Sequence, residues 1–402
     1  MKMYSAKRMQ AGVPALPGNE RAVLLILFLA LFVGTADTQI FSPYLPLLAK
    51  TFDTTPGVFG RVVAIYSVCA AAAALMAGVA SDVRGHGLFL KAALGLFTAS
   101  ELATAYSSSV TMFIVLRGVT GLSAGVISAC TISYAADYFP YKARGKAMGI
   151  IMASYFAAAT IGVVGLAKIA DRAGWPAGYE VLAGTAFVAF ILLMTLMPNA
   201  SVEEQVETSE QSGVVFRPSV IAMFILAFFV SGGLTTFLVY IGSYLSETFQ
   251  KTTSQIALVF LIGGGTAVIA APIAGRIADA IGKRPMIIGG NLAMAALFIL
   301  IPRMQWGVVL FIIFGLASLA AALRQGPFQA YSTAVIGRRR RGLLVAIRNV
   351  CSQLGIASGA LIGGSLYNRS GGFELVALFC GAMTLAACLP VFLVKEPAQD
   401  GC

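Results

Sequence analysis

The chain has 402 residues, of which 58% are hydrophobic and only 11% are charged, and its mean hydropathy is +0.85. A soluble domain carries roughly 25% charged residues and could not cover its surface with this composition. The net charge of +11 sits in short connectors, as at residues 338–341, with no recognition motif beside it, which argues against nucleic-acid binding. The composition predicts an all-α membrane protein.

Twelve apolar runs follow one another along the chain, each long enough to cross a bilayer as a helix. They cover residues 22–48, 58–81, 88–106, 110–135, 147–167, 178–197, 218–245, 255–278, 286–302, 307–333, 342–366 and 373–394. The first run is too long for a signal-peptide core, so we interpret it as a retained helix.

The polar segments divide these runs into two equal groups. Residues 1–21 are expected to form a leader, 198–217 a linker and 395–402 a tail. The remaining ranges, 22–197 and 218–394, are then two bundles of six helices each.

Lys and Arg residues are distributed unevenly between the two sides of this arrangement. Of the 28, Arg117 and Arg324 lie within spans. If the N-terminus is cytoplasmic, seven lie on the outer side, which leaves nineteen for the cytoplasm. Since positively charged connectors are retained in the cytoplasm, we predict that leader, linker and both termini are cytoplasmic. The protein is expected in the cell inner (plasma) membrane.

The two groups of spans repeat one another at an offset of 197 residues. Gly78 and Asp82 match Gly275 and Asp279 in this register. Further pairs at the same offset are Thr51 with Thr248, Tyr134 with Tyr331, Arg144 with Arg341, and Gly162 with Gly359. Because each half has an even number of spans, both halves enter the membrane from the same side. The repeat is therefore parallel.

The strongest repeated element is a short motif between the second and third spans of each half. Its residues are Gly78, Asp82, Arg84 and Gly85 in the first copy, and Gly275, Asp279, Gly282, Lys283 and Arg284 in the second. This pattern resembles the G-x-x-x-D-(R/K)-x-G-(R/K) signature of the major facilitator superfamily. The resemblance implies the major facilitator fold of twelve helices in two parallel repeats, and a gating role for the motif. Val83 and His86 depart from it.

Within the superfamily, the chain resembles the twelve-span drug:proton antiporters and arabinose-efflux permeases. The fourth span fits their R-x-x-Q-G pattern from Arg117 to Gly121, with Thr120 in place of glutamine. The fifth span lacks the Gly-Pro of the antiporter motif, so the direction of transport stays open. The resemblance implies secondary active transport of a small organic or amphipathic solute by a monomer, with protons as coupling ion.

Asp37 and Arg117 are charged residues deep within the first and fourth spans, where charge is costly. At 1.5 Å per residue, they lie roughly 16 Å and 10 Å from the outer ends of their helices. An arginine side chain can span that difference. We therefore predict an Asp37–Arg117 pair that takes part in proton coupling, with a permanent structural ion pair as the alternative.

Arg324 precedes Gly326 and Pro327 in the tenth span, and its repeat counterpart is Ile127. It indicates either a substrate with negative charge or an arginine that binds carbonyl groups at a kink. Glu101, at the outer end of the third span, is expected to reach the membrane interface. By position alone, the other residues expected to line a substrate cavity are Gln39, Tyr44, Tyr134, Tyr240, Gln325 and Tyr331.

Small residues at helical spacing predict two close helix contacts. Gly121 and Gly125 follow Arg117 at intervals of four in the fourth span. The eleventh span carries Gly355, Gly359 and Gly363.

Two other functions stay open beside proton-coupled export. One is an organic-anion carrier that uses Arg117 and Arg324, and the other is a non-transporting receptor or assembly factor on the same scaffold. The sequence contains no nucleophile–base pair, metal-ligand spacing or ATP-binding loop, so enzymatic activity, a metal site and a cofactor are not expected. The expected partners are the solute, protons and lipid.

Overall fold

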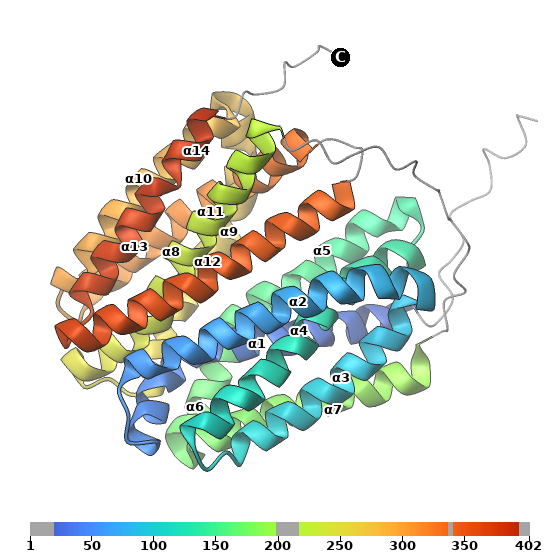
Figure 1. The fold of residues 1–402 in the computed structure, drawn as a ribbon, viewed down its shortest axis with the longest axis horizontal. Helices are drawn as coiled ribbons and strands as arrows, with labels where there is room; N and C mark the ends of the chain where they lie inside the picture. The colour runs from blue at the N-terminus through green and yellow to red at the C-terminus, as the bar shows by residue number, and fades with distance from the viewer. Residues whose placement is uncertain (1–19, 198–216, 337–340, 394–402) are drawn as a thin grey trace, which may run out of the picture.

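The computed structural model describes residues 20–197, 217–336 and 341–393, almost all of them helical (Figure 1). In this part of the chain, twelve helices are long and apolar enough to cross a membrane. Each coincides with one predicted span, although the ends differ by a few residues. The all-α fold with twelve spans is thereby confirmed, whereas the leader, nearly all of the linker and the tail lie outside the described residues.

The six spans before the linker, here called the N-half, and the six after it, the C-half, lie on opposite sides of Figure 1. The N-half comprises α1 (Glu20–Thr51), α2 (Gly60–Arg84), α3 (His86–Ala105), α4 (Val110–Tyr138), α5 (Tyr141–Ala157) with α6 (Val163–Ala173), and α7 (Trp175–Leu196). The C-half comprises α8 (Pro218–Phe249), α9 (Thr253–Ile281), α10 (Lys283–Leu300), α11 (Val308–Ile336), α12 (Arg341–Ser370), and α13 (Glu374–Ala386) with α14 (Cys388–Leu393). The short turns are η1 (Pro56–Phe59), the π-helical η2 (Ala158–Gly162) and η3 (Ile301–Arg303).

The tight turns α2–α3 and α9–α10 show the repeat in the backbone itself. Gly85 has φ 90° and Gly282 has φ 94°, values that favour glycine because it lacks a Cβ. Each glycine N–H donates to the carbonyl four residues earlier, which ends the preceding helix. The offset of 197 residues therefore holds for backbone conformation as well as for sequence. We call this end of the bundle the motif end.

Two of the helices that start at the other end of the bundle, here the opposite end, α4 and α9, begin with side-chain caps. Ser109 Oγ accepts a hydrogen bond from the Met112 N–H at 3.2 Å and starts α4. Thr252 and Gln255 cap each other's backbone N–H groups at the start of α9, at 3.4 and 3.1 Å. These bonds satisfy amide groups that have no partner within the helix.

Glycines bring α2 and α4 into backbone contact, as their spacing predicts. A Cβ at Gly125 would lie 2.2 Å from the Ala70 carbonyl oxygen, and one at Gly121 would lie 2.4 Å from that of Tyr66. In the C-half, a Cβ at Gly355 would lie 2.1 Å from the Phe228 carbonyl oxygen. The predicted small-residue contacts of the fourth and eleventh spans are thus confirmed.

We expect Gly125→Val to destabilise the protein, because the added side chain would overlap the Ala70 backbone on α2. Overpacking of this kind costs about 1–3 kcal/mol. The matched control is Gly149→Val on α5, where a Cβ would meet no atom within 4 Å. Thermal unfolding of the purified variants should show a lower melting temperature for Gly125→Val alone. Equal melting temperatures would mean that the α2–α4 contact is not required.

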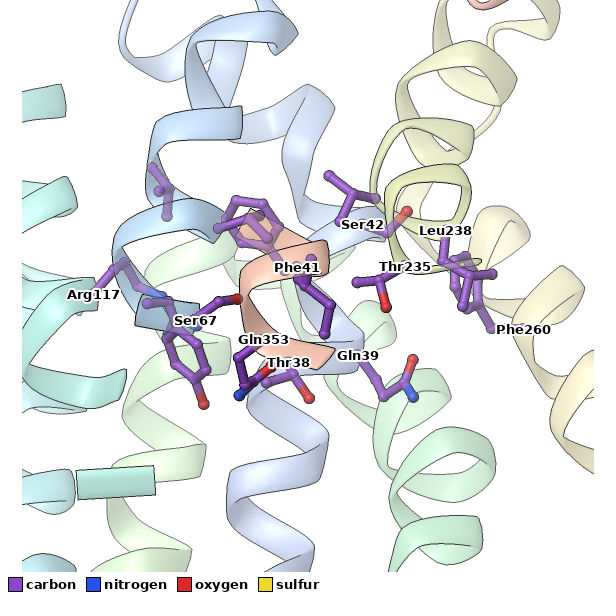
Figure 2. A pocket seen from close by; sticks show the side chains of 15 residues that line it. Thr38, Gln39, Phe41, Ser42, Ser67, Arg117, Thr235, Leu238, Phe260 and Gln353 are labelled. Carbon is purple, nitrogen blue, oxygen red and sulfur yellow. The ribbon is translucent and has the colours of Figure 1, made fainter. Parts of the chain in front are cut away.

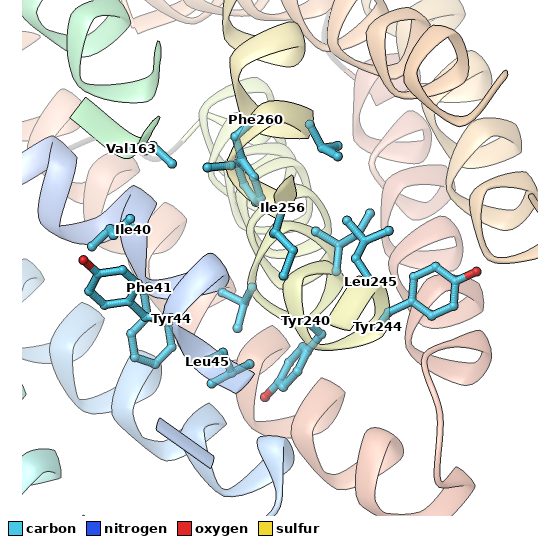
Figure 3. Packing of buried hydrophobic residues seen from close by; sticks show 14 of the residues in the cluster. Ile40, Phe41, Tyr44, Leu45, Val163, Tyr240, Tyr244, Leu245, Ile256 and Phe260 are labelled. Carbon is cyan, nitrogen blue, oxygen red and sulfur yellow. The ribbon is translucent and has the colours of Figure 1, made fainter. Parts of the chain in front are cut away.

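The two halves meet closely at the opposite end. The Gly242 N–H of α8 donates to Ser42 Oγ of α1 at 3.3 Å. A buried hydrophobic cluster joins residues of both halves there, including Tyr44 and Leu45 from α1 and Tyr240 and Leu245 from α8 (Figure 3). Apolar packing across the interface therefore holds the halves together at this end.

Two further contacts seal the opposite end. The Asp171 carboxylate of α6 accepts hydrogen bonds from the Thr253 and Ser254 N–H groups at 3.1 and 2.9 Å. These amides open α9, where the helix dipole favours a negative charge. On the other side, η1 is so near α12 that a Cβ at Gly57 would lie 2.2 Å from Asn368 Oδ1. The described conformation is closed at the opposite end.

Candidate functional site

Two adjoining cavities, of about 290 and 620 Å³, lie between the halves. Both are lined by Gln39, Thr235, Leu238, Phe260 and Ile356, so they form one continuous region. Along α1 and α8, which both start at the motif end, no lining residue lies beyond the contact between Ser42 and Gly242. The cavities therefore lie on the motif side of the closed end.

The smaller cavity is lined by polar and apolar residues of both halves in nearly equal number. Figure 2 shows Arg117 reaching from α4, Thr38 and Gln39 on α1, and Gln353 on α12 around this space. A volume near 300 Å³ is at the low end for organic ligands. Gln39, which was predicted to line a substrate cavity, lies in the wall of this one, and so does Arg117, which was predicted to pair with Asp37.

Asp37 and Arg117 form the predicted pair across α1 and α4. Arg117 Nη2 donates to Asp37 Oδ2 at 2.9 Å, and Arg117 Nη1 donates to Asp37 Oδ1. The Asp37 side chain is fully buried, and that of Arg117 is nearly so. Two parallel charge-assisted bonds of this kind are both strong and directional. Asp37 is therefore held in one geometry by Arg117.

Glu101 joins this pair, and its predicted place at the membrane interface is wrong. It is fully buried, and Arg117 Nη1 donates to Glu101 Oε1 at 3.3 Å. Depth along the antiparallel helices α3 and α4 would have indicated this contact. Glu101 lies roughly 6 Å from the end of α3 and Arg117 roughly 10 Å from the start of α4, at 1.5 Å per residue.

Asp37, Glu101 and Arg117 form a cluster of two carboxylates and one guanidinium, here called the carboxylate cluster. Two carboxylates share one guanidinium, and Glu101 Oε2 has no hydrogen-bond partner among the described residues. The rings of Tyr66 and Tyr179 lie 4.8 and 5.8 Å from Arg117 Cζ. These rings stabilise the cation and keep water from it. The carboxylate cluster carries a formal charge of −1 when both carboxylates are ionised.

The larger cavity is predominantly apolar, and Arg324 is the one charged residue that the structure places in its wall. Arg324 is fully buried, and its Nη1 donates to Asn291 Oδ1 at 2.8 Å. Its Nε and Nη2 have no hydrogen-bond partner in the described part of the chain. Gln325 also lines this cavity, as predicted, and α11 continues without a break through Pro327.

Four tyrosines that the sequence placed in a substrate cavity line neither of these two cavities: Tyr44, Tyr134, Tyr240 and Tyr331. All four are buried. The Tyr44 hydroxyl donates to the Leu166 carbonyl at 2.8 Å, and that of Tyr240 donates to the Ala360 carbonyl at 2.7 Å. The other two pack within apolar clusters of their own halves. In this conformation all four serve helix packing.

Arg284 and His86, which lie at the two turns, contact residues of their own half. Arg284 Nη2 donates to the Phe392 carbonyl at 3.0 Å and thereby binds the end of α14. His86, which stands where a basic residue is usual, lies 2.8 Å from Ser81 Oγ and 3.2 Å from the Asp137 carboxylate of α4. Both contacts brace the motif end of a half.

Several residues of the motif, which was predicted to act as a gate, lie outside the described part of the structure. The side chains of Asp82 and Asp279, and Gly275, lie outside the described residues. A Cβ at Gly78 would meet no atom within 4 Å, so packing does not require this glycine in the described conformation. Arg84 is exposed and Lys283 is half-buried. The gating role of the motif stays a prediction.

Two six-helix repeats around a central cavity with buried charges define a membrane transporter. The chain belongs to the Major Facilitator Superfamily, whose family model matches residues 27–241 and 223–401. It is consequently a multi-pass protein of the inner membrane and a transporter, not an enzyme.

Known members of the superfamily align with nearly the whole chain. The uncharacterized MFS-type transporter YceJ of Bacillus subtilis is 25% identical, over 90% of this chain and 94% of that protein. Multidrug resistance protein 2 of the same organism is 22% identical, over 95% and 97%. The crystal structure of a D-xylose-proton symporter matches with a TM-score of 0.78 and 19% identity, over 94% and 98%. This last likeness concerns the fold alone.

Proposed function

We propose that the protein exports a small organic or amphipathic solute in exchange for protons, by alternating access. The observation that supports this most directly is the carboxylate cluster, which is buried in a transporter and borders the cavity between the halves through Arg117. When both of its carboxylates are ionised, this cluster carries one uncompensated negative charge, and a bound proton neutralises it. Relatives named as multidrug resistance proteins support the proposal that the solute is organic and that it is exported.

Glu101 is the proton-carrying group in this proposal. A net charge of −1 in a buried site is costly, and a proton on one carboxylate removes it. Asp37 holds Arg117 through two bonds, whereas Glu101 accepts one bond from Arg117, at 3.3 Å, and its Oε2 has no hydrogen-bond partner among the described residues. The proton therefore binds to Glu101. Asp37, predicted as the coupling carboxylate, then acts as the fixed counter-ion of Arg117.

The direction of export depends on the orientation of the protein in the membrane. We propose that both termini are cytoplasmic, because nineteen Lys and Arg residues lie on that side and seven on the other. The motif end is then cytoplasmic, and the described conformation receives solute from the cytoplasm. Each half supplies one wall of the cavity, so a monomer suffices for transport.

The test is transport by purified protein in proteoliposomes, screened with cationic, neutral and anionic aromatic compounds. We expect the wild type to accumulate at least one compound against its gradient when a pH gradient is imposed. Glu101→Gln should lose at least roughly tenfold of this uphill rate, equivalent to 1.4 kcal/mol. It should keep downhill exchange of the same compound, since exchange needs no net proton movement.

The matched control is Glu180→Gln, which removes an exposed carboxylate on α7 and should leave both rates unchanged. Full pH-driven accumulation by well-folded Glu101→Gln protein would remove Glu101 from the mechanism. Absence of any pH-driven accumulation by the wild type would overturn proton coupling as a whole.

A further inference from the structure

We propose that Arg324 is an anion-binding residue and that the solute is an amphipathic organic anion with a carboxylate-like group on an apolar, aromatic-sized body. This assignment rests on the proposed transport function and specifies its substrate. Three observations support it: Arg324 has no counter-ion among the described residues, one edge of its guanidinium has no hydrogen-bond partner there, and the residues that line the larger cavity suit an apolar body.

Arg324 is a buried cation without a compensating carboxylate among the described residues. Its one described hydrogen bond is to the neutral amide of Asn291, and its side chain is fully buried. An arginine stays protonated in proteins, so burial does not remove the charge. A buried charge without a counter-ion costs several kcal/mol. Arg117, by contrast, is paired with two carboxylates, so of the two arginines that line the cavities Arg324 is the one without a carboxylate beside it among the described residues.

The unpartnered atoms of Arg324 are the two that a carboxylate binds best. Nε and Nη2 lie on the same edge of the guanidinium, and neither has a partner in the described structure. Two parallel N–H groups match the two oxygens of a carboxylate and form a bidentate pair. Nη1, bound to Asn291, fixes the orientation of the group. The free edge therefore selects a planar anion.

The repeat accounts for part of the apolar surface of the larger cavity. At the offset of 197, the counterparts of Asp37, Glu101 and Arg117 are Leu234, Phe298 and Phe314. All three counterparts line the larger cavity. The N-half thus uses these positions for the carboxylate cluster, and the C-half uses the same positions for an apolar surface.

The volume of this cavity and its lining residues indicate the size and the polarity of the ligand. About 620 Å³ falls within the range of drug-sized ligand sites. The rings of Phe260, Phe298 and Phe314 border it, and the amides of Gln325 and Gln329 add neutral hydrogen-bonding groups. An aromatic body contacts these rings while its anionic group binds Arg324. The cavity offers no carboxylate among its described lining residues, so an organic cation lacks a counter-ion there.

Equilibrium binding tests this with three probes of one shape: 2-naphthoate, 2-naphthamide and 2-naphthylmethylammonium. Titrations of the purified full-length protein, without a pH gradient, should show at least a tenfold preference of the wild type for naphthoate over both other probes. Arg324→Gln should lose this preference and bind naphthoate no more tightly than naphthamide. Arg324→Lys keeps the charge without the two-pronged edge and should retain only part of it.

The matched control is Arg303→Gln, an exposed arginine of η3, which should keep the full preference. Failure of the wild type to prefer naphthoate, including failure to bind it, would overturn the anion site, and so would an undiminished preference in folded Arg324→Gln protein. Because no proton gradient is used, this result is independent of the Glu101→Gln transport test. Either proposal can therefore fail while the other stands.

Discussion

Replacing Arg117 with alanine should abolish pH-driven transport and lower the free energy of unfolding by about 3–5 kcal/mol. The substitution leaves Asp37 and Glu101 fully buried without a counter-cation. The pH dependence follows from the sign of these charges. Protons neutralise the two carboxylates at low pH, so the loss relative to the wild type should be largest at high pH and should shrink as the pH falls. Thermal unfolding across pH, together with proteoliposome transport, measures both effects.

Arg117→Lys is the informative companion variant. It keeps one positive charge but loses the two parallel bonds to Asp37, so its stability should lie between those of the wild type and Arg117→Ala. Arg303→Ala, which removes an exposed arginine, is the control for a general effect of charge removal. Wild-type stability and transport in Arg117→Ala would show that the carboxylate cluster does not need its cation.

Gly242→Val should prevent the opposite end from closing and reduce transport by roughly tenfold or more, equivalent to at least 1.4 kcal/mol. A Cβ at this position would lie 2.1 Å from the Ser42 carbonyl oxygen, on the helix of the other half. The overlap exists only while α1 and α8 touch. The variant should therefore favour the conformation in which the opposite end is open and the motif end is closed.

Spin labels on Val83 and Ile281, both exposed at the motif end, report this shift as a distance between the halves. We expect the distance to shorten in Gly242→Val and to stay unchanged in Gly265→Val, where a Cβ would meet no atom within 4 Å. If both variants keep the wild-type distance and transport rate, the Ser42–Gly242 contact has no part in the conformational change.

Several features of the site could be predicted from the sequence because they depend on position along a helix. The depth of Asp37 and Arg117 in their spans was sufficient to pair them, since rise per residue is constant. The offset of 197 residues paired Gly85 with Gly282, and both adopt the same positive φ. Glycine spacing was sufficient to predict the close approach of α4 at Gly125, because residues four apart share one helix face.

Other features depend on the rotation and contacts of each helix, which the sequence did not reveal. Glu101 faces Arg117 instead of lipid because of how α3 packs against α4. Tyr44 and Tyr240 are in the right spans, but their hydroxyls bind carbonyls of neighbouring helices instead of facing a cavity.

The sequence by itself determined the twelve spans, the parallel repeat and the family, because these follow from hydropathy, helix length and the register of a motif. Only the tertiary structure decided which arginine is paired. Both lie deep within their spans and are equally basic, yet Arg117 has two carboxylates beside it, and Arg324 has the amide of Asn291. That difference arises from which neighbouring helix each side chain faces. Local sequence contains no information on that choice, because a membrane helix is apolar on nearly every face and its rotation is set by its partners.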